Sequence, residues 1–149
     1  KFKNLKDLHI VVLGKINSSE LNKLNISYTE ISKNFFGEPE DLMEIYSSVD
    51  LVIMPSLIEA FGQVALEAAA CNVPTVGFDN TGIKEIITHK KNGYIAEYKN
   101  SEDLYEGIKW CLEDNNLENL KKECRNIVKE KFDNIHIVNK YRQLYENLI

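Results

Sequence analysis

The sequence lacks any excess of positive charge. Its 149 residues include 18 Lys and Arg against 23 Asp and Glu, a formal net charge of -5. Proteins that bind nucleic acid carry a basic patch or stripe that neutralises phosphates. The one local basic cluster, Lys84 with residues 89–91, is interpreted as a solvated turn. The charge balance therefore argues against a nucleic-acid partner.

Cysteine is scarce, and its three copies are far apart in the chain. Neither the cysteines nor the three histidines show the close spacing that is typical of metal ligands. These residues are Cys71, Cys111, Cys124, His9, His89 and His136. An odd number of scattered cysteines favours a reduced, cytosolic setting with buried or idle thiols. We therefore predict no metal site and no disulfide framework.

Long hydrophobic runs are missing too. No stretch of 18 apolar residues occurs, so no membrane-spanning helix is predicted. The charged start, residues 1–7, has no apolar secretory core behind it and reads as the middle of a longer protein. A chain of this length is large enough to bury a core of its own. We expect one domain over residues 1–149.

Short apolar runs alternate with helical patterns along the whole chain. Strands are expected at residues 8–13, 26–31, 51–54, 75–78 and 94–96. Helices are expected at residues 41–48, 62–71, 82–88, 101–113, 117–131 and 134–148, with Ser101 as an N-cap. This alternation predicts an α/β fold, a doubly wound, Rossmann-like and mostly parallel sheet with C-terminal helices. No Gly-x-Gly-x-x-Gly follows residues 8–13, so a dinucleotide oxidoreductase is not indicated.

Two acids, Glu59 and Glu67, stand in the most apolar surroundings of the chain. Glu67 is the only charged residue between Ala60 and Ala70, in a helical segment with small apolar residues on all sides. Such a helix is normally buried, and burying an unpaired carboxylate costs several kcal/mol. We therefore expect hydrogen-bond donors around Glu67, and a bound ligand can supply them.

The segment between the two acids suits a phosphate. Parallel sheets bind ligands at the carboxyl ends of their strands, and Glu59 follows the strand at residues 51–54. The next helix is expected to begin with unpaired backbone N–H groups at residues 61–63, and its dipole favours an anion there. Glu67 lies about one and a half turns further on. A nucleoside-diphosphate sugar, with phosphates in the middle and hydroxyls at both ends, fits this pattern.

The segment Glu59-Ala-Phe-Gly-Gln-Val-Ala-Leu-Glu67 resembles the motif of two Glu separated by seven residues in the retaining glycosyltransferases of family 4. That motif belongs to the C-terminal lobe of the GT-B fold. Residues 36–50, 72–76, 81–87, 92–94 and 131–145 resemble the family's flanking elements. The resemblance covers nearly the whole chain, and it is specific in combination.

The resemblance implies a role for each site residue. Glu59 would bond the donor sugar's hydroxyls and is the catalytic candidate, and Glu67 would bond the two ribose hydroxyls. Backbone N–H groups of residues 61–64 would line the sugar and diphosphate, and the backbone around Pro39, with Asp41 nearby, would face the base. The predicted substrate-binding residues are Glu59, Ala60, Phe61, Gly62, Gln63, Val64, Glu67, Pro39, Asp41, Thr81 and Gly82.

The sequence departs from the family pattern in its positive charge and its glycines. Thr81 replaces the first of two paired glycines, which leaves the role of that loop open. The family's diphosphate-binding Arg and Lys lie on a strand that would precede residue 1. Gly14-Lys15-Ile16 stands where the family has Gly-acid-Gly. Lys15 could supply compensating charge or could simply be solvated.

The resemblance implies the donor-binding domain of a retaining, metal-independent, hexosyl-type glycosyltransferase. It would use a nucleoside-diphosphate sugar, without a cofactor, and transfer the sugar to a glycan, lipid or other acceptor. The expected partner is an N-terminal, acceptor-binding lobe of the same protein, so this chain would be truncated at its N-terminal edge. The expected location is cytoplasmic, with peripheral attachment to the inner face of the membrane through that lobe as an option.

Two alternatives stay open at this point. One is a lobe of a GT-B nucleotide-sugar epimerase, although no convincing His or Asp pair for acid and base work is present. The other is a non-catalytic module that keeps the GT-B-like fold for protein contacts. At the C-terminus, Tyr141, Leu144, Tyr145 and Leu148 form an apolar stripe, part of which we expect to be exposed.

Overall fold

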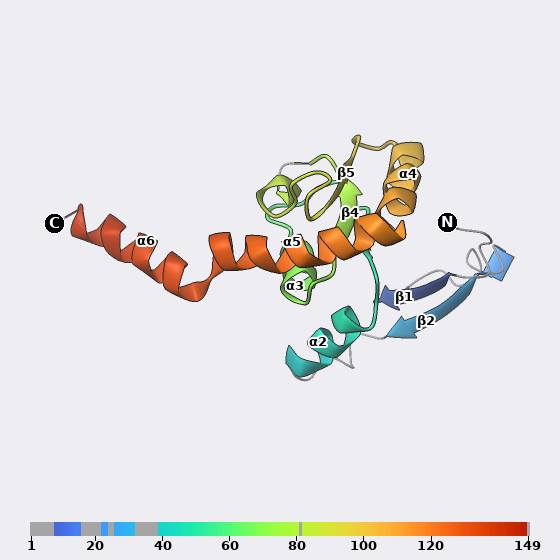
Figure 1. The fold of residues 1–149 in the computed structure, drawn as a ribbon, viewed down its shortest axis with the longest axis horizontal. Coiled ribbons are helices and arrows are strands. Elements are labelled where there is room, and N and C mark those ends of the chain that lie inside the picture. The colour runs from blue at the N-terminus through green and yellow to red at the C-terminus, as the bar shows by residue number, and fades with distance from the viewer. Residues whose placement is uncertain (1–7, 16–21, 24–25, 32–38, 81, 149) are drawn as a thin grey trace. The chain divides into compact units, whose positions relative to one another are not determined.

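The chain divides into two compact units, residues 1–49 and 50–149 (Figure 1). The computed structural model describes residues 8–15, 22–23, 26–31, 39–80 and 82–148. Each unit has its own parallel sheet, one of two strands and one of three. The predicted α/β class with parallel pairing is therefore confirmed, and the described strands form two ladders.

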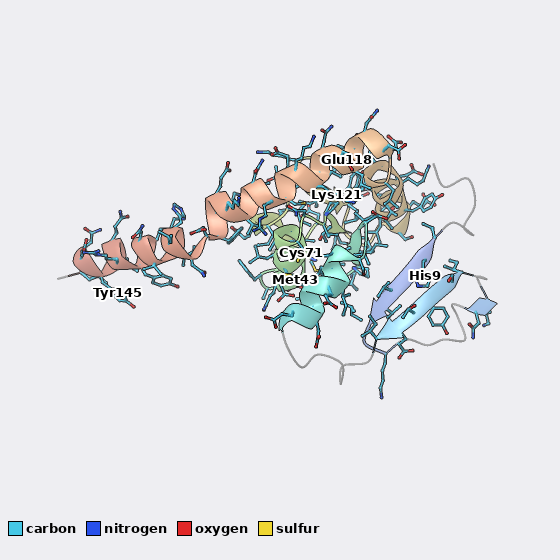
Figure 2. All side chains as sticks on the ribbon, turned by 60° about the horizontal axis from the view of Figure 1, so that its bottom comes forward. His9, Met43, Cys71, Glu118, Lys121 and Tyr145 are labelled. Carbon is cyan, nitrogen blue, oxygen red and sulfur yellow. The ribbon has the colours of Figure 1, made fainter. Side chains whose placement is uncertain are left out.

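The first unit contains strands β1 (His9–Leu13) and β2 (Ser27–Ile31) and helix α2 (Pro39–Ser47). The strands pair in parallel, from His9 opposite Ser27 to Leu13 opposite Ile31. The side chain of His9 is labelled in Figure 2. Its Nδ1 lies 2.7 Å from the Ser27 hydroxyl, and its Nε2 lies 2.9 Å from the Thr29 hydroxyl. The imidazole thus joins two side chains of the neighbouring strand.

The second unit is built on strands β3 (Val52–Met54), β4 (Thr75–Phe78) and β5 (Gly93–Ala96), in that order across the sheet. All neighbours are parallel. The helices are α3 (Gln63–Ala70), η3 (Ile83–Glu85, a 3-10 turn), α4 (Ser101–Cys111), α5 (Asp114–Phe132) and α6 (Asn134–Glu146). Every residue of the central strand β4 is buried, because it has a strand on both sides and helices over it.

Two hydrophobic clusters hold the second unit together. The first consists of Met54, Ala65, Ile83, Ile86 and Ile87, which come from β3, α3 and the segment after β4. The second consists of Val76, Cys111 and Leu120, and it joins β4 to α4 and α5. Ile83 and Ile86 of the first cluster lie close to Gly62 at the start of α3, so this cluster supports the candidate site described below.

None of the three cysteines, all of which lie in the described part of the chain, forms a disulfide, and two of them are buried. Burial raises the pKa of Cys111 and of Cys124 to about 12. The Cys124 thiol donates a 3.3 Å hydrogen bond to the Asn92 carbonyl. Since the thiolate is the reactive form, these two thiols are chemically quiet. The prediction of buried thiols is confirmed for them, and Cys71 is half-buried.

Three local expectations were wrong. The N-cap of α4 is Asn100, whose side chain accepts from the N–H groups of Glu102 and Asp103; asparagine caps as well as serine does. The helix expected at residues 82–88 is only the short turn η3, with Ile86 and Ile87 turned into the core. The strand at residues 51–54, whose unbroken apolar run favours burial on both faces, exposes 46% of Ile53, because this side chain points to the face opposite the buried Met54.

The core and the C-terminal helix should respond differently to truncation. Leu120 is 1% exposed, whereas Leu144 on α6 is 54% exposed. We expect Leu120→Ala to lower the free energy of unfolding by about 2–5 kcal/mol. Leu144→Ala should change it by less than about 0.5 kcal/mol. Urea unfolding followed by circular dichroism checks both values, and equal losses would contradict this description of α6.

Within the described part of the chain, no helix is both long and apolar enough to cross a membrane.

Candidate functional site

The loop between β3 and α3 ends in a turn that is closed by a hydrogen bond. Gly62 is the N-cap of α3 and has φ 90° and ψ 41°, a left-handed conformation that glycine adopts without strain. Its N–H donates a 3.2 Å hydrogen bond to Oε1 of Glu59. We call residues 59–62 the Glu59 turn. The half-buried Glu59 carboxylate is thereby held at the N-terminal end of α3.

The N-terminus of α3 is open to a ligand in part. The first intrahelical hydrogen bond runs from the Leu66 N–H to the Gly62 carbonyl, 3.1 Å. The N–H groups of Gln63 and Val64 precede that bond, and no side chain caps the helix. The expectation that the Gly62 N–H is also unpaired was wrong, because Glu59 accepts from it. Two of the predicted N–H donors therefore remain at the helix start.

Glu67 is not the buried acid that its apolar neighbours suggest. It is half-buried, and its Oε1 accepts a 3.0 Å hydrogen bond from the side chain of the exposed Gln63. Helix α3 turns Ala65, Ala68 and Ala69 into the core and keeps its opposite side accessible. Burial of the Glu67 carboxylate therefore gives no reason to expect a ligand there. The contact with ribose hydroxyls that the family resemblance implies does not depend on burial, and it stays a prediction.

The loop after β4 is attached to the Glu59 turn. The Gly82 N–H donates a 3.0 Å hydrogen bond to the Glu59 carbonyl. A Cβ atom at Gly82 would lie 2.5 Å from the Glu59 oxygen, the Ala60 carbonyl carbon and the Phe61 nitrogen. Only a glycine fits this approach of two backbones. The geometry thus gives Gly82 a supporting role beneath the predicted site, and Thr81 lies outside the described residues.

A second link between the two loops comes from Asn80, which sequence reasoning missed. Its Nδ2 donates a 2.8 Å hydrogen bond to the Ser56 carbonyl, across the ends of β3 and β4. The available signal was its position directly after a buried strand, where parallel sheets place their functional loops. Nearby, Lys84 forms a 2.6 Å ion pair with Asp79. Both side chains are about half exposed, so salt screens this pair.

Apolar side chains surround the Glu59 turn. Leu57, Ile58, Phe61 and Val64 are 47%, 89%, 42% and 42% exposed. The Phe61 ring meets the Phe132 ring edge-on, with centroids 5.9 Å apart and planes at 80°. Phe132 is the last residue of α5, and its contact with the loop was not foreseen. Exposed apolar side chains therefore stand just before, within and just after the turn in the chain.

The predicted site residues fall into both units. Ala60, Phe61, Gln63 and Val64 lie beside Glu59 and Glu67 on the β3–α3 segment, with Gly82 against it. Pro39 begins α2 in the first unit, Asp41 lies in its first turn, and Lys15 is exposed after β1. Within the described residues, no group of three or more His, Cys, Asp or Glu side chains could hold a metal ion.

Comparison with solved structures shows which fold the chain has. The chain resembles Anabaena HepE in complex with UDP and glucose, with a TM-score of 0.71, 24% identity and coverage of 93% of this chain and 39% of that one. It also resembles the pneumococcal O-GlcNAc transferase GtfA in complex with UDP and GlcNAc, with a TM-score of 0.71, 22% identity and coverage of 94% and 29%. The fold is that of the GT-B glycosyltransferases.

Sequence comparison then identifies the family. Residues 1–131 match the family described as Glycosyl transferases group 1, and the chain belongs to it. It is 33% identical over 116 residues to the N-acetyl-alpha-D-glucosaminyl L-malate synthase of Bacillus anthracis. That alignment covers 77% of this chain and 30% of that protein. It is also 34% identical over 117 residues to the N,N'-diacetylbacillosaminyl-diphospho-undecaprenol alpha-1,3-N-acetylgalactosaminyltransferase of Campylobacter jejuni. That alignment covers 78% of this chain and 31% of that protein. The chain thus spans about a third of the length of these relatives.

Proposed function

We propose that this chain is the C-terminal, nucleotide-sugar-binding lobe of a retaining glycosyltransferase of the family 4 type. The proposed whole enzyme moves a hexose-type sugar from a nucleoside-diphosphate donor to a glycan, lipid or other acceptor. Two of the solved neighbours hold UDP with glucose or GlcNAc, which supports a UDP-sugar as the first donor to test. Both curated relatives described above carry names of sugar-transferring enzymes, which supports the same class of reaction.

The observation that carries this proposal is the order of groups along the β3–α3 segment. Glu59 is held by the Gly62 N–H at the helix start, the N–H groups of Gln63 and Val64 follow, and Glu67 lies on the next turn. One turn of helix rises about 5.4 Å. A ligand lying along α3 would thus meet a carboxylate, then N–H donors, then a second carboxylate. Sugar hydroxyls, a diphosphate and ribose hydroxyls match this order of acceptors and donors.

The proposed chemistry needs stabilisation of a leaving diphosphate. N–H donors at a helix start are fixed dipoles that favour the charge developing on the leaving oxygens. Glu59 would accept hydrogen bonds from the donor sugar and orient its anomeric carbon, and we propose it as the catalytic candidate in that sense. We propose that neither a metal ion nor a cofactor takes part. Ala60, Pro39, Asp41 and Thr81 stay predicted contacts of the donor.

The proposed partner is a second lobe of the same protein, which would bind the acceptor. The exposed side of α6 supports a partner surface. All residues of α6 are described, and none is buried. Tyr141, Leu144, Tyr145 and Leu148 are 58%, 54%, 62% and 74% exposed, which confirms the expected stripe, and Tyr145 projects from α6 in Figure 2. A cytoplasmic location, with peripheral membrane attachment through the second lobe, belongs to the same proposal.

Titration with nucleotide sugars tests the function. We expect UDP-glucose, GDP-mannose or ADP-glucose to shift the backbone amide signals of residues 59–67 and 82 in NMR spectra of the chain, because the ligand lies along these groups. The α6 signals serve as an internal control and should stay in place. No response to any of the three at millimolar concentration would contradict the proposal and favour a non-catalytic interaction module. Shifts confined to another part of the chain would contradict the proposed site.

A further inference from the structure

The end of α5 reaches the Glu59 turn through one aromatic contact. Phe132 meets Phe61 edge-on at 5.9 Å between ring centroids. Phe61 lies inside the turn that the Gly62 N–H and the Glu59 carboxylate close. Phe61 lies two residues after Glu59, so its backbone is part of this turn. The contact thus joins a residue far along the chain to the turn that holds the Glu59 carboxylate.

Phe132 is itself firmly supported. Its ring packs against the cluster that contains Met54, Ala65 and Ile83. Helix α5 is anchored along its length by the buried residues Leu120, Cys124 and Ile127, and by a hydrogen bond from Arg125 to the Ala70 carbonyl at the end of α3. Figure 1 shows α5 running across the second unit to this end. Phe132 is therefore a fixed surface against which the more exposed Phe61 ring rests.

The helix stops immediately after this contact. Asp133 adopts φ -59° and ψ 134°, an extended conformation, and its side chain caps α6 by accepting from the Ile135 N–H, 2.9 Å. Phe132 is thus the last side chain of α5, and the chain changes direction there rather than continuing past the loop. The break leaves the Phe132 ring at the helix end, where it reaches Phe61.

We propose that Phe132 is a positioning residue for the donor site, which it serves by holding Phe61 and, with it, the Glu59 turn. The expected effect on donor binding rests on the proposed function. The expected effect on the Gly62–Glu59 hydrogen bond concerns the chain without a ligand and does not rest on it. Phe132 has two contacts that lead toward the site, the aromatic pair with Phe61 and the cluster that includes Ala65 in the first turn of α3. The proposed route is the aromatic pair.

The test compares three variants. Phe132→Leu keeps apolar packing on the core cluster and removes the ring edge, whereas Phe132→Tyr keeps the ring. Ile87→Val is the matched control, because it weakens the same cluster at a residue that is 3% exposed. We expect Phe132→Leu to weaken binding of UDP-glucose roughly 3- to 10-fold, the range for loss of an aromatic pair. Phe132→Tyr and Ile87→Val should bind as the unchanged chain does.

A double variant separates positioning from general destabilisation. If Phe132 acts on the donor site through its contact with Phe61, the double variant Phe61→Leu/Phe132→Leu should bind UDP-glucose no more weakly than the weaker-binding single variant. Additive losses would overturn the proposal. So would a Phe132→Leu variant that binds normally, or one whose loss is matched by Ile87→Val.

The Gly62 amide gives a readout that needs no ligand. The exchange of its proton with solvent reports the hydrogen bond to Glu59, whereas its chemical shift would also respond to the lost ring current of Phe132. Phe132→Leu should therefore speed exchange at Gly62, and Ile87→Val should leave the rate unchanged. If no nucleotide sugar binds the unchanged chain but exchange is faster in Phe132→Leu, the proposed function fails and the positioning role stands. An unchanged exchange rate in Phe132→Leu would overturn the positioning role, whatever binds.

Discussion

Gly82→Ala is expected to abolish most donor binding. The added Cβ would lie 2.5 Å from three backbone atoms of residues 59–61, none of which can rotate away as a side chain does. The Glu59 turn would have to move by roughly 1 Å to reach ordinary contact distance. That displacement would break the hydrogen bonds that Glu59 is proposed to make with the donor sugar, and each bond to a charged group contributes about 1.5–3 kcal/mol. We therefore expect UDP-glucose binding, measured by calorimetry, to weaken at least about 10-fold.

Gly107→Ala is the matched control for this variant. A Cβ at Gly107 would lie 2.4 Å from the Tyr94 ring, which is a similarly short approach away from the loops after β3 and β4, although it involves a side chain rather than the backbone. Both variants should lose stability, by about 1–3 kcal/mol for typical overpacking. Only Gly82→Ala should lose binding beyond what unfolding explains. Equal binding by the two variants would show that the Glu59 turn tolerates displacement.

Glu67→Ala is expected to separate binding from stability. In the proposed function its carboxylate accepts from two ribose hydroxyls, and each hydrogen bond to a charged group contributes about 1.5–3 kcal/mol. Binding of UDP-glucose should therefore weaken at least about 100-fold. The free energy of unfolding should change by less than about 0.5 kcal/mol or rise, because Glu67 is half-buried and its side-chain partner Gln63 is exposed.

Gln63→Ala controls for the contact within α3. It removes the 3.0 Å hydrogen bond to Glu67 and leaves the backbone N–H of residue 63 in place. Binding by this variant should change little. If Glu67→Ala unfolds in urea far more easily than Gln63→Ala, Glu67 is a structural acid and the ribose contact is wrong. Normal binding by Glu67→Ala would contradict the contact as well.

Much of the fold could be predicted from short-range pattern. The apolar run at residues 75–78 coincides with β4, and the pattern at residues 134–148 agrees closely with α6. Such patterns succeed because they depend on the period of each element, which neighbouring residues set. The element after Gly82 was overestimated, because its isoleucines serve the core cluster rather than a continuous helix face.

Only the part of the candidate site that lies on the β3–α3 segment could be predicted from the sequence. The spacing of Glu59 and Glu67 and the helix start between them are local, and the structure brings these together on the β3–α3 segment. The burial of Glu67 was not local. The small residues of α3 suggested burial on all sides, but only the side with Ala65, Ala68 and Ala69 faces the core.

By itself, the sequence determined the parallel α/β class, the position of the acids after a strand and the exposed stripe of α6, because each depends on residues close together in the chain. The tertiary structure alone decided what holds the site. Gly82 meets the Glu59 turn, Asn80 bonds Ser56, and Phe132 meets Phe61. These pairs are distant in sequence, and no periodicity records which of many compatible surfaces will meet once the sheet and its helices have packed.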